Sequence, residues 1–102
     1  MMVMKKETIL THLSKAKEKY APEGFLLLGL FGSFAKGEET HYSDIDVAYR
    51  IEHERFSQKY RDGFAKLLRI DEIRKELENE LHKKVDLVPD ANPEVTEGMI
   101  RV

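Results

Sequence analysis

The 102-residue chain contains no cysteine, which excludes a disulfide framework. It also lacks an N-terminal apolar segment long enough to serve as a signal peptide or membrane anchor, so we expect a cytoplasmic protein with no membrane contact. Internal repeats and low-complexity stretches are missing as well. What is present is a chain with 41% hydrophobic residues, enough for one modest core, and we expect a single domain spanning residues 1–102.

An excess of charge of one sign is lacking too. The chain has 17 basic and 19 acidic residues in a well-mixed order, with a net charge of −2. Because proteins that bind polymeric nucleic acid usually carry a basic surface, neither strong nucleic-acid binding nor a template-bound polymerase is expected. The four histidines include no pair at metal-ligand spacing on one element, and we interpret them as structural or exposed. His41 is the exception, because it precedes an acidic segment and could touch a ligand bound there.

The first informative segment is the apolar run from Phe25 to Phe31, which is too short for a membrane helix and predicts a buried strand. Gly32 ends the run and allows the backbone to turn sharply and a ligand to come close. Ser33 follows with a hydroxyl that can cap a helix start. The exposed N–H groups of such a turn favour anions, and phosphate is the anion we expect. Taken alone, a Gly-Ser pair after a strand is more often an ordinary turn.

Two carboxylates follow after ten intervening residues. Residues 44–51 predict a strand, whose side chains alternate, so Asp44 and Asp46 project from one face while their apolar neighbours project from the other. Like charges this close are unfavourable unless a divalent cation is bound or a carboxyl pKa is raised. Ser43 suits the turn that enters the strand. The simpler interpretation makes Asp44 a turn residue and Asp46 a solvated strand residue.

A third acid, Asp86, is the one polar residue inside the short aliphatic segment from Val85 to Val88, which predicts another strand. If this strand pairs beside that of Asp44 and Asp46, three carboxylates can share one face. Three acids could hold two magnesium ions, one activating an attacking hydroxyl and the other holding a triphosphate and its leaving group. The alternative is an exposed acid on an edge strand.

These segments closely resemble the minimal nucleotidyltransferases of the DNA polymerase β superfamily, and more narrowly the MntA-type antitoxins that pair with HEPN-domain toxins. The resemblance rests on Gly32 to Gly37, on Ser43 to Asp46 and on Val85 to Val88, in this order and spacing. It spans about residues 25 to 88, most of the chain. It implies a polymerase β-like nucleotidyltransferase fold, with ATP as the first candidate substrate.

The resemblance also implies roles residue by residue. Gly32 and Ser33 would hold nucleotide phosphates, and Asp86 would also be the base for the acceptor hydroxyl. The implied catalytic residues and metal ligands, for two Mg²⁺ ions, are Asp44, Asp46 and Asp86. The implied nucleotide-binding residues are Gly32, Ser33, Lys36 and Ser43. Many relatives have arginine where this chain has Lys36, which keeps the positive charge but loses a bidentate phosphate contact.

Helical patterns fill most of the remaining chain. Residues 4–20 predict an amphipathic helix, whose apolar face comprises Ile9, Leu13, Ala16 and Tyr20. Residues 53–82 predict two helices or one bent helix, with a break near Arg69 to Asp71 and with Asp71 capping the second half. The apolar stripe of this region comprises Phe56, Tyr60, Phe64, Leu67, Ile70, Ile73, Leu77 and Leu81.

We interpret the aromatic part of that stripe as core, although an excess over what a small sheet can bury would mark a partner surface. Gly63 should weaken the first half by roughly 1 kcal/mol relative to alanine. Tyr42 and Tyr49 lie close to the acidic segments in sequence, with simple packing or exposure as the alternative to a role there. Residues 94–102 form a tail that could be a small strand, a frayed terminus or part of a partner contact.

Together these patterns predict an α/β (α+β) domain with a small mixed β-sheet, helices packed on one face and a catalytic site on the open edge. The expected reaction is magnesium-dependent transfer of AMP from ATP to a hydroxyl of a partner protein. By resemblance, that hydroxyl belongs to a tyrosine of a HEPN toxin, and the chain acts as its antitoxin. Two alternatives stay open: a non-catalytic module that occludes its partner, and transfer to a small-molecule hydroxyl. Whether the chain forms a homo-oligomer or a hetero-oligomer is also left open.

Overall fold

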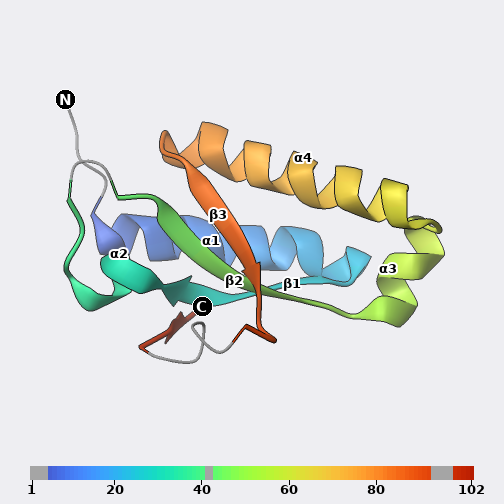
Figure 1. The fold of residues 1–102 in the computed structure, drawn as a ribbon, viewed down its shortest axis with the longest axis horizontal. Coiled ribbons are helices and arrows are strands. Elements are labelled where there is room, and N and C mark those ends of the chain that lie inside the picture. Colours follow the sequence, from blue (N-terminus) through green and yellow to red (C-terminus); the bar gives the residue numbers. More distant parts are fainter. Residues whose placement is uncertain (1–4, 41–42, 93–97) are drawn as a thin grey trace.

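The computed structural model describes residues 5–40, 43–92 and 98–102, and Figure 1 shows their arrangement. The helices are α1 (Lys6–Tyr20), the 3₁₀ turn η1 (Ala21–Glu23), α2 (Gly32–Lys36), α3 (His53–Lys59) and α4 (Gly63–Leu81). The strands are β1 (Phe25–Phe31), β2 (Ile45–Ile51), β3 (Val85–Pro89) and β4 (Ile100–Arg101). No helix in the described ranges is both long and apolar enough to cross a membrane.

The sheet has the strand order β3-β2-β1-β4. Strands β2 and β3 run parallel, whereas β1 pairs antiparallel with both β2 and β4. A parallel pair needs a long crossover, which α3 and α4 provide between β2 and β3. The predicted mixed sheet is therefore confirmed, and the strand that carries Asp86 does pair beside the strand that carries Asp46.

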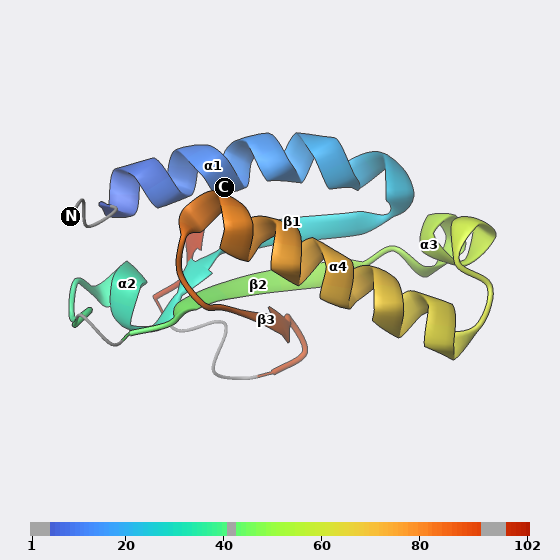
Figure 2. The ribbon, with the colours of Figure 1, turned by 90° about the horizontal axis from the view of Figure 1, so that it is seen from above.

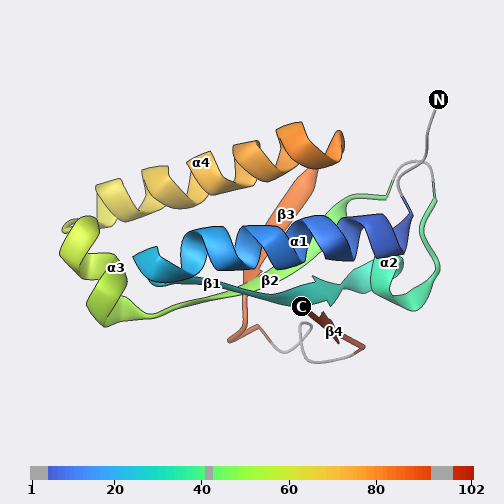
Figure 3. The ribbon, with the colours of Figure 1, turned by 180° about the vertical axis from the view of Figure 1, so that it is seen from behind.

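Helices α1 and α4 cover one face of this sheet, as the views from above and from behind show (Figures 2 and 3). The main core lies between these two helices and the strands, and it draws buried residues from α1, α4, β1, β2 and β3. The face of the sheet turned away from α1 and α4 is called the open face below. The fold class expected from the sequence, an α+β domain with helices on one face, is confirmed.

The apolar face predicted for the first helix is confirmed, because each of its members is buried. Those residues are Ile9, Leu13, Ala16 and Tyr20. The predicted helix start at residue 4 lies outside the described residues, and the described helix begins at Lys6. In the C-terminal tail, a two-residue strand, Ile100–Arg101, forms on the edge of β1. Of the three structures predicted for the tail, its described end forms the small strand.

The predicted helix break near Arg69 to Asp71 is wrong, because the chain breaks at residues 60–62 instead. Asp62 caps α4, and its side chain accepts a hydrogen bond from the Ala65 N–H at 2.7 Å. Asp71 lies inside α4, where it forms ion pairs one turn along the helix rather than a cap. Gly63 is the first residue of α4, so the penalty expected for a glycine in a helix interior does not arise.

The single apolar stripe predicted across residues 56–81 is also wrong in part. Ile73 and Leu77 are fully buried, but Phe64 is 73% exposed and Leu67 is 68% exposed. Phe64 lies nine residues before Ile73 in the same helix, which is two and a half turns. The two side chains therefore point to opposite sides of α4. The exposed aromatic and aliphatic residues at the start of α4 are the excess that the sequence interpretation associated with a partner surface.

A polar network ties α3 and α4 to the end of α1. Arg69 forms a two-pronged pair with Glu23, at 2.9 and 2.7 Å, and its guanidinium lies over the Tyr20 ring. Tyr60 donates a hydrogen bond to Glu23, and Tyr20 donates one to Glu76 at 2.9 Å. The hydrogen bond from Arg69 holds the pKa of Glu23 below its ordinary value, while burial raises the pKa of Tyr60 to about 12. The network fixes the helical layer far from α2.

Candidate active site

The turn after β1 depends on a glycine that touches an acid. Gly32 has a φ of +75°, in the left-handed region, and a Cβ placed on it would lie 2.2 Å from Oδ2 of Asp46. Because real Cβ atoms never approach that closely, no other residue fits here without moving the carboxylate or the turn. Helix α2 starts at this glycine, so its first N–H groups lie beside Asp46. The Gly-Ser turn and the acidic strand therefore meet in space.

Two of the three predicted acids are neighbours across the parallel pair. Asp46 of β2 is in register with Asp86 of β3, and Phe31 of β1 is in register with Asp46 on the other side. Ile45 and Val47, which flank Asp46, are fully buried among the core residues under α1 and α4. Strand alternation then places Asp46 and Asp86 on the open face. Asp46 is half-buried and Asp86 is exposed.

Asp44 and Ser43 lie in the segment that enters β2. Asp44 is exposed and stands one residue before the strand, which begins with the Ile45 N–H donating to the Lys84 carbonyl at 2.9 Å. Ser43 closes a turn with Thr40: its hydroxyl accepts from the Thr40 N–H at 2.8 Å, and its own N–H donates to the Thr40 carbonyl at 3.1 Å. Ser43 thus has the turn role that its position suggested, and its predicted nucleotide contact stays a prediction.

The remaining predicted residues lie in different surroundings. Ser33 is half-buried at the start of α2, beside the acids, and Lys36 is exposed at the end of α2. Tyr49 belongs to the core side, where its ring stacks on Phe25 at 5.0 Å and where burial raises the pKa of its hydroxyl. Packing is therefore the explanation for Tyr49. The predictions for His41 and Tyr42 lie outside the described residues.

Comparison with known proteins places this geometry in a family. Residues 11–99 match the family described as nucleotidyltransferase domain. The chain belongs to that family. The matched range holds the Gly32 turn and all three acids, so this nucleotidyltransferase carries its candidate site inside the conserved domain rather than in an added segment. Its enzyme class is that of a transferase of nucleotidyl groups.

Individual relatives narrow the comparison. A protein of Methanocaldococcus jannaschii, described provisionally as a protein adenylyltransferase, is 34% identical over 83 residues, which are 81% of this chain and 72% of the relative. A solved structure described provisionally as a minimal nucleotidyltransferase superposes with a TM-score of 0.70 at 26% identity, covering 97% of both chains. A crystal structure described as a toxin–antitoxin with AMP-PNP shares the fold, with a TM-score of 0.58 at 24% identity over 93% of this chain and 70% of that one.

Carboxylate oxygens suit a hard divalent cation, and the nucleotidyltransferase offers them side by side at Asp46 and Asp86. In the ranges that the structure describes, however, no group of three or more histidine, cysteine, aspartate or glutamate side chains is arranged to hold a metal ion. Magnesium is usually bound by one or two carboxylates together with substrate phosphates rather than by a cage made of protein alone. The residues present therefore fit a metal that is completed by its nucleotide.

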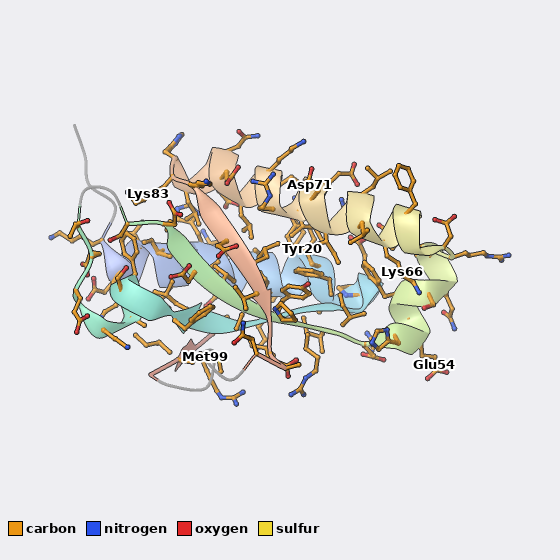
Figure 4. All side chains as sticks on the ribbon, in the orientation of Figure 1. Tyr20, Glu54, Lys66, Asp71, Lys83 and Met99 are labelled. Atoms are coloured by element: carbon orange, nitrogen blue, oxygen red, sulfur yellow. The ribbon has the colours of Figure 1, made fainter. Side chains whose placement is uncertain are left out.

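Sequence reasoning missed several residues that share this region. Arg50 and Asp90 form an ion pair on the open face beyond the acids, at 2.6 Å. Lys83 lies two residues before β3, at the same end of the molecule as α2 (Figure 4), with its ammonium 5.9 Å from the centre of the Phe34 ring. The alternation of Asp46 and Arg50 along one strand could have revealed the first of these. The second required the fold, because α2 and β3 are distant in sequence.

Proposed function

We propose that this nucleotidyltransferase transfers AMP from ATP to a hydroxyl group of a partner protein and releases pyrophosphate. The observation that carries the proposal is the contact between the Gly32 turn and Asp46, with Asp86 in register beside it. That arrangement brings a phosphate-binding turn and two carboxylates to one end of the open face. The relative described as a protein adenylyltransferase supports a protein acceptor.

In the proposed reaction the acceptor oxygen attacks the α-phosphorus of ATP. A new P–O bond forms to the acceptor, and the bond from the α-phosphorus to the oxygen bridging toward the β-phosphate breaks, so pyrophosphate leaves. Gly32 and Ser33 bind the phosphates that leave, with Lys36 and Ser43 as the further proposed nucleotide contacts. Asp86 accepts the proton of the acceptor hydroxyl. Two Mg²⁺ ions, when bound to Asp44, Asp46 and Asp86, would neutralise phosphate charge as the P–O bonds exchange.

The proposed acceptor is a tyrosine of a HEPN-type toxin, which makes the chain an antitoxin that silences its partner by covalent modification. The sequence resemblance supports this partner, and so does the shared fold of the toxin–antitoxin crystal structure with AMP-PNP. The complex would be a hetero-oligomer in the cytoplasm. Within this proposal the chain needs no acceptor domain of its own, since the toxin brings the hydroxyl.

The test is to incubate the protein with ATP labelled on its α-phosphate, magnesium and the purified product of the adjacent reading frame. We expect label on a tyrosine of that product, and loss of the label with Asp44→Ala or Asp46→Ala. Asp71→Ala is the matched control, because it removes an acid from α4, outside the site. The catalytic proposal is ruled out if no label reaches the product of the adjacent reading frame, or if all three variants label that product equally.

The exposed start of α4 favours a second candidate function, that of an antitoxin acting by occlusion alone. Phe64 and Leu67 are 73% and 68% exposed, a typical feature of a protein-binding surface. A neutralisation assay separates the candidates, because an occluding antitoxin protects cells as well with Asp46→Ala as with the parent residue. A catalytic antitoxin loses that protection.

A further inference from the structure

The open face of β2 and β3 is organised in successive pairs of residues, here called rungs. The parallel register continues beyond the acids for as long as the two strands run together. From the site outward, the acid rung is Asp46 with Asp86, the apolar rung is Ala48 with Val88, and the ion-pair rung is Arg50 with Asp90. Alternation along β2 places Asp46, Ala48 and Arg50 on the same face, and Asp90, just beyond the end of β3, joins that face through its ion pair with Arg50.

The apolar rung is the floor of a small apolar surface. Ala48 is fully buried, and Val88 is half-buried against the same cluster. Two further half-buried side chains, Leu28 of β1 and Met99 of the C-terminal tail, pack onto this cluster together with buried Phe31. The surface therefore offers hydrocarbon directly beside two carboxylates, and polar groups are absent from its described members.

The ion-pair rung closes the far side of this surface. Arg50 donates from Nε to Asp90 Oδ2 at 2.7 Å, and a second guanidinium nitrogen lies 2.6 Å from the same oxygen. The backbone N–H of Asp90 donates to the Tyr49 carbonyl at 2.9 Å, so the carboxylate is held in place. Arg50 is nevertheless 61% exposed. It can meet a polar group of an incoming molecule without leaving its partner.

The spacing of the rungs suits one aromatic side chain. Neighbouring rungs are two residues apart along each strand, about 7 Å. That is close to the length of a tyrosine side chain from its hydroxyl to its backbone. A phenol whose hydroxyl reaches Asp86 would lay its ring on Val88 and leave its main chain near Arg50. An aliphatic hydroxyl, such as that of serine, would reach the acid while leaving the apolar rung uncovered.

The geometry of the reaction decides whether the ring that lies on Val88 belongs to the acceptor or to the adenine. The phosphates that leave are proposed to lie at Gly32, which borders Asp46 on the β1 side. Attacking and leaving oxygens stand in line in phosphoryl-type transfer, so the acceptor enters from the opposite side, over β3. In the described sheet, β3 is the edge strand next to β2, and no described strand lies beyond it. The acceptor, rather than the adenine, therefore meets Val88.

We propose that the apolar rung of Ala48 and Val88 is the acceptor subsite, and that it selects a phenolic hydroxyl over an aliphatic one. The inference rests on the proposed function and adds the residues that choose the acceptor. Val88 is the specificity-determining residue, since Ala48 is fully covered and Val88 is not. Arg50, fixed by Asp90, orients the main chain that carries the ring.

The experiment measures AMP transfer to two small acceptors, N-acetyl-tyrosinamide and N-acetyl-serinamide, and to the product of the adjacent reading frame. Val88→Lys places a charge on the apolar rung, Val88→Ile restores hydrocarbon, and Leu68→Lys is the matched control at an exposed position of α4. We expect the parent to prefer tyrosinamide by about tenfold or more, and Val88→Lys to raise KM for tyrosinamide by a similar factor. KM for ATP should stay within about twofold, and Val88→Ile and Leu68→Lys should behave like the parent with the two small acceptors.

Three results would overturn the subsite: equal transfer to the two small acceptors, unchanged KM for tyrosinamide in Val88→Lys, or a rise in KM for ATP instead. The last of these would assign the rung to the adenine. Thermal unfolding of each variant, followed by circular dichroism, shows whether it remains folded. If the parent labels tyrosinamide and Asp46→Ala does not, while Val88→Lys changes nothing, the subsite fails and the proposed function stands. If the parent labels none of the acceptors, the proposed function fails and the subsite falls with it.

Discussion

Gly32→Ala tests the contact on which the candidate site depends. The substitution adds one carbon at a position where a Cβ would lie 2.2 Å from Asp46 Oδ2, 3.1 Å from its Cγ and 3.3 Å from its Cβ. The whole carboxylate side chain is therefore in the way, not only its tip. Since Asp46 is half-buried on the open face, it can rotate away, and the turn can shift by a fraction of an ångström. Either adjustment separates the Gly32 turn, the proposed phosphate-binding element, from the acid.

Gly37→Ala is the matched control for the backbone. Gly37 has a φ of +72°, close to the +75° of Gly32, but nothing lies within 4 Å of a Cβ placed on it. Both variants therefore lose about 1 kcal/mol for an alanine in the left-handed region, which lowers Tm by about 4 to 8 °C in a domain of this size. Only Gly32→Ala adds the steric term, which we expect to cost about 1 to 3 kcal/mol more.

The decisive measurement is the rate of AMP transfer relative to stability. A displacement of about 1 Å in a catalytic group can cost about 100-fold in rate, so Gly32→Ala should lose transfer by that factor at a temperature where it is still folded. Gly37→Ala should transfer AMP at nearly the parent rate. If Gly32→Ala and Gly37→Ala unfold at the same temperature and transfer AMP equally, the contact with Asp46 does not govern the site, and the reasoning is refuted.

Three further predictions concern the scaffold. Arg69→Ala leaves Glu23, whose side chain is 12% exposed, with the Tyr60 hydrogen bond but without its cationic partner. The free energy of unfolding should therefore fall by about 2 to 3 kcal/mol in urea denaturation, against less than about 1 kcal/mol for the exposed ion pair lost in Arg55→Ala. Because folding lowers the pKa of Glu23, the stability that its carboxylate contributes is complete above the unfolded pKa near 4.5 and is lost as pH falls through the folded pKa. The stability advantage of the parent over Glu23→Gln should therefore shrink on acidification, and an advantage that grows would contradict the assignment. Leu77→Ala should cost about 2 to 5 kcal/mol because Leu77 is fully buried, whereas exposed Leu67→Ala should stay within about 0.5 kcal/mol, and equal losses would show that the start of α4 is packed.

The parts of the site that the sequence predicted are those encoded by local alternation. Ile45 and Val47 are buried, so Asp46 between them had to lie on the other face, and the same rule placed Asp86 opposite the side chain of Val85. The pairing of the two strands side by side was a conditional expectation, and its parallel direction, which the helical crossover allows, was seen only in the fold. Glycine at position 32 was predicted for its backbone freedom, but its contact with Asp46 was visible only in the fold.

What the sequence did not predict depends on helix phase and on distant partners. The Asp62 cap breaks the helical region earlier than expected, and Phe64 lies two and a half turns from Ile73 in the same helix, on its exposed side. Gly29 looks like a weak point of a buried strand, yet a Cβ there would lie 2.3 Å from the Ile100 carbonyl, because β4 pairs with β1 at that place. No local pattern links Gly29 to the other end of the chain. The ion pair of Arg50 with Asp90 was missed as well, although the alternation of Asp46 and Arg50 along β2 hinted at the side of the sheet on which Arg50 lies.

The exposure of Asp86 on the open face has a consequence for how this site must work. In the proposed reaction, a nucleotide at Gly32 and a carboxylate open to water would form only part of an active site, since charges in water interact weakly and water competes as an acceptor. The chain supplies a floor of rungs, with Leu28 and Met99 packed against the apolar one, and no described strand lies beyond the edge at β3. A protein acceptor laid across β3 would bring its hydroxyl and exclude water in one step. Specificity for the partner and efficiency of transfer would then come from the same contact, centred on Val88.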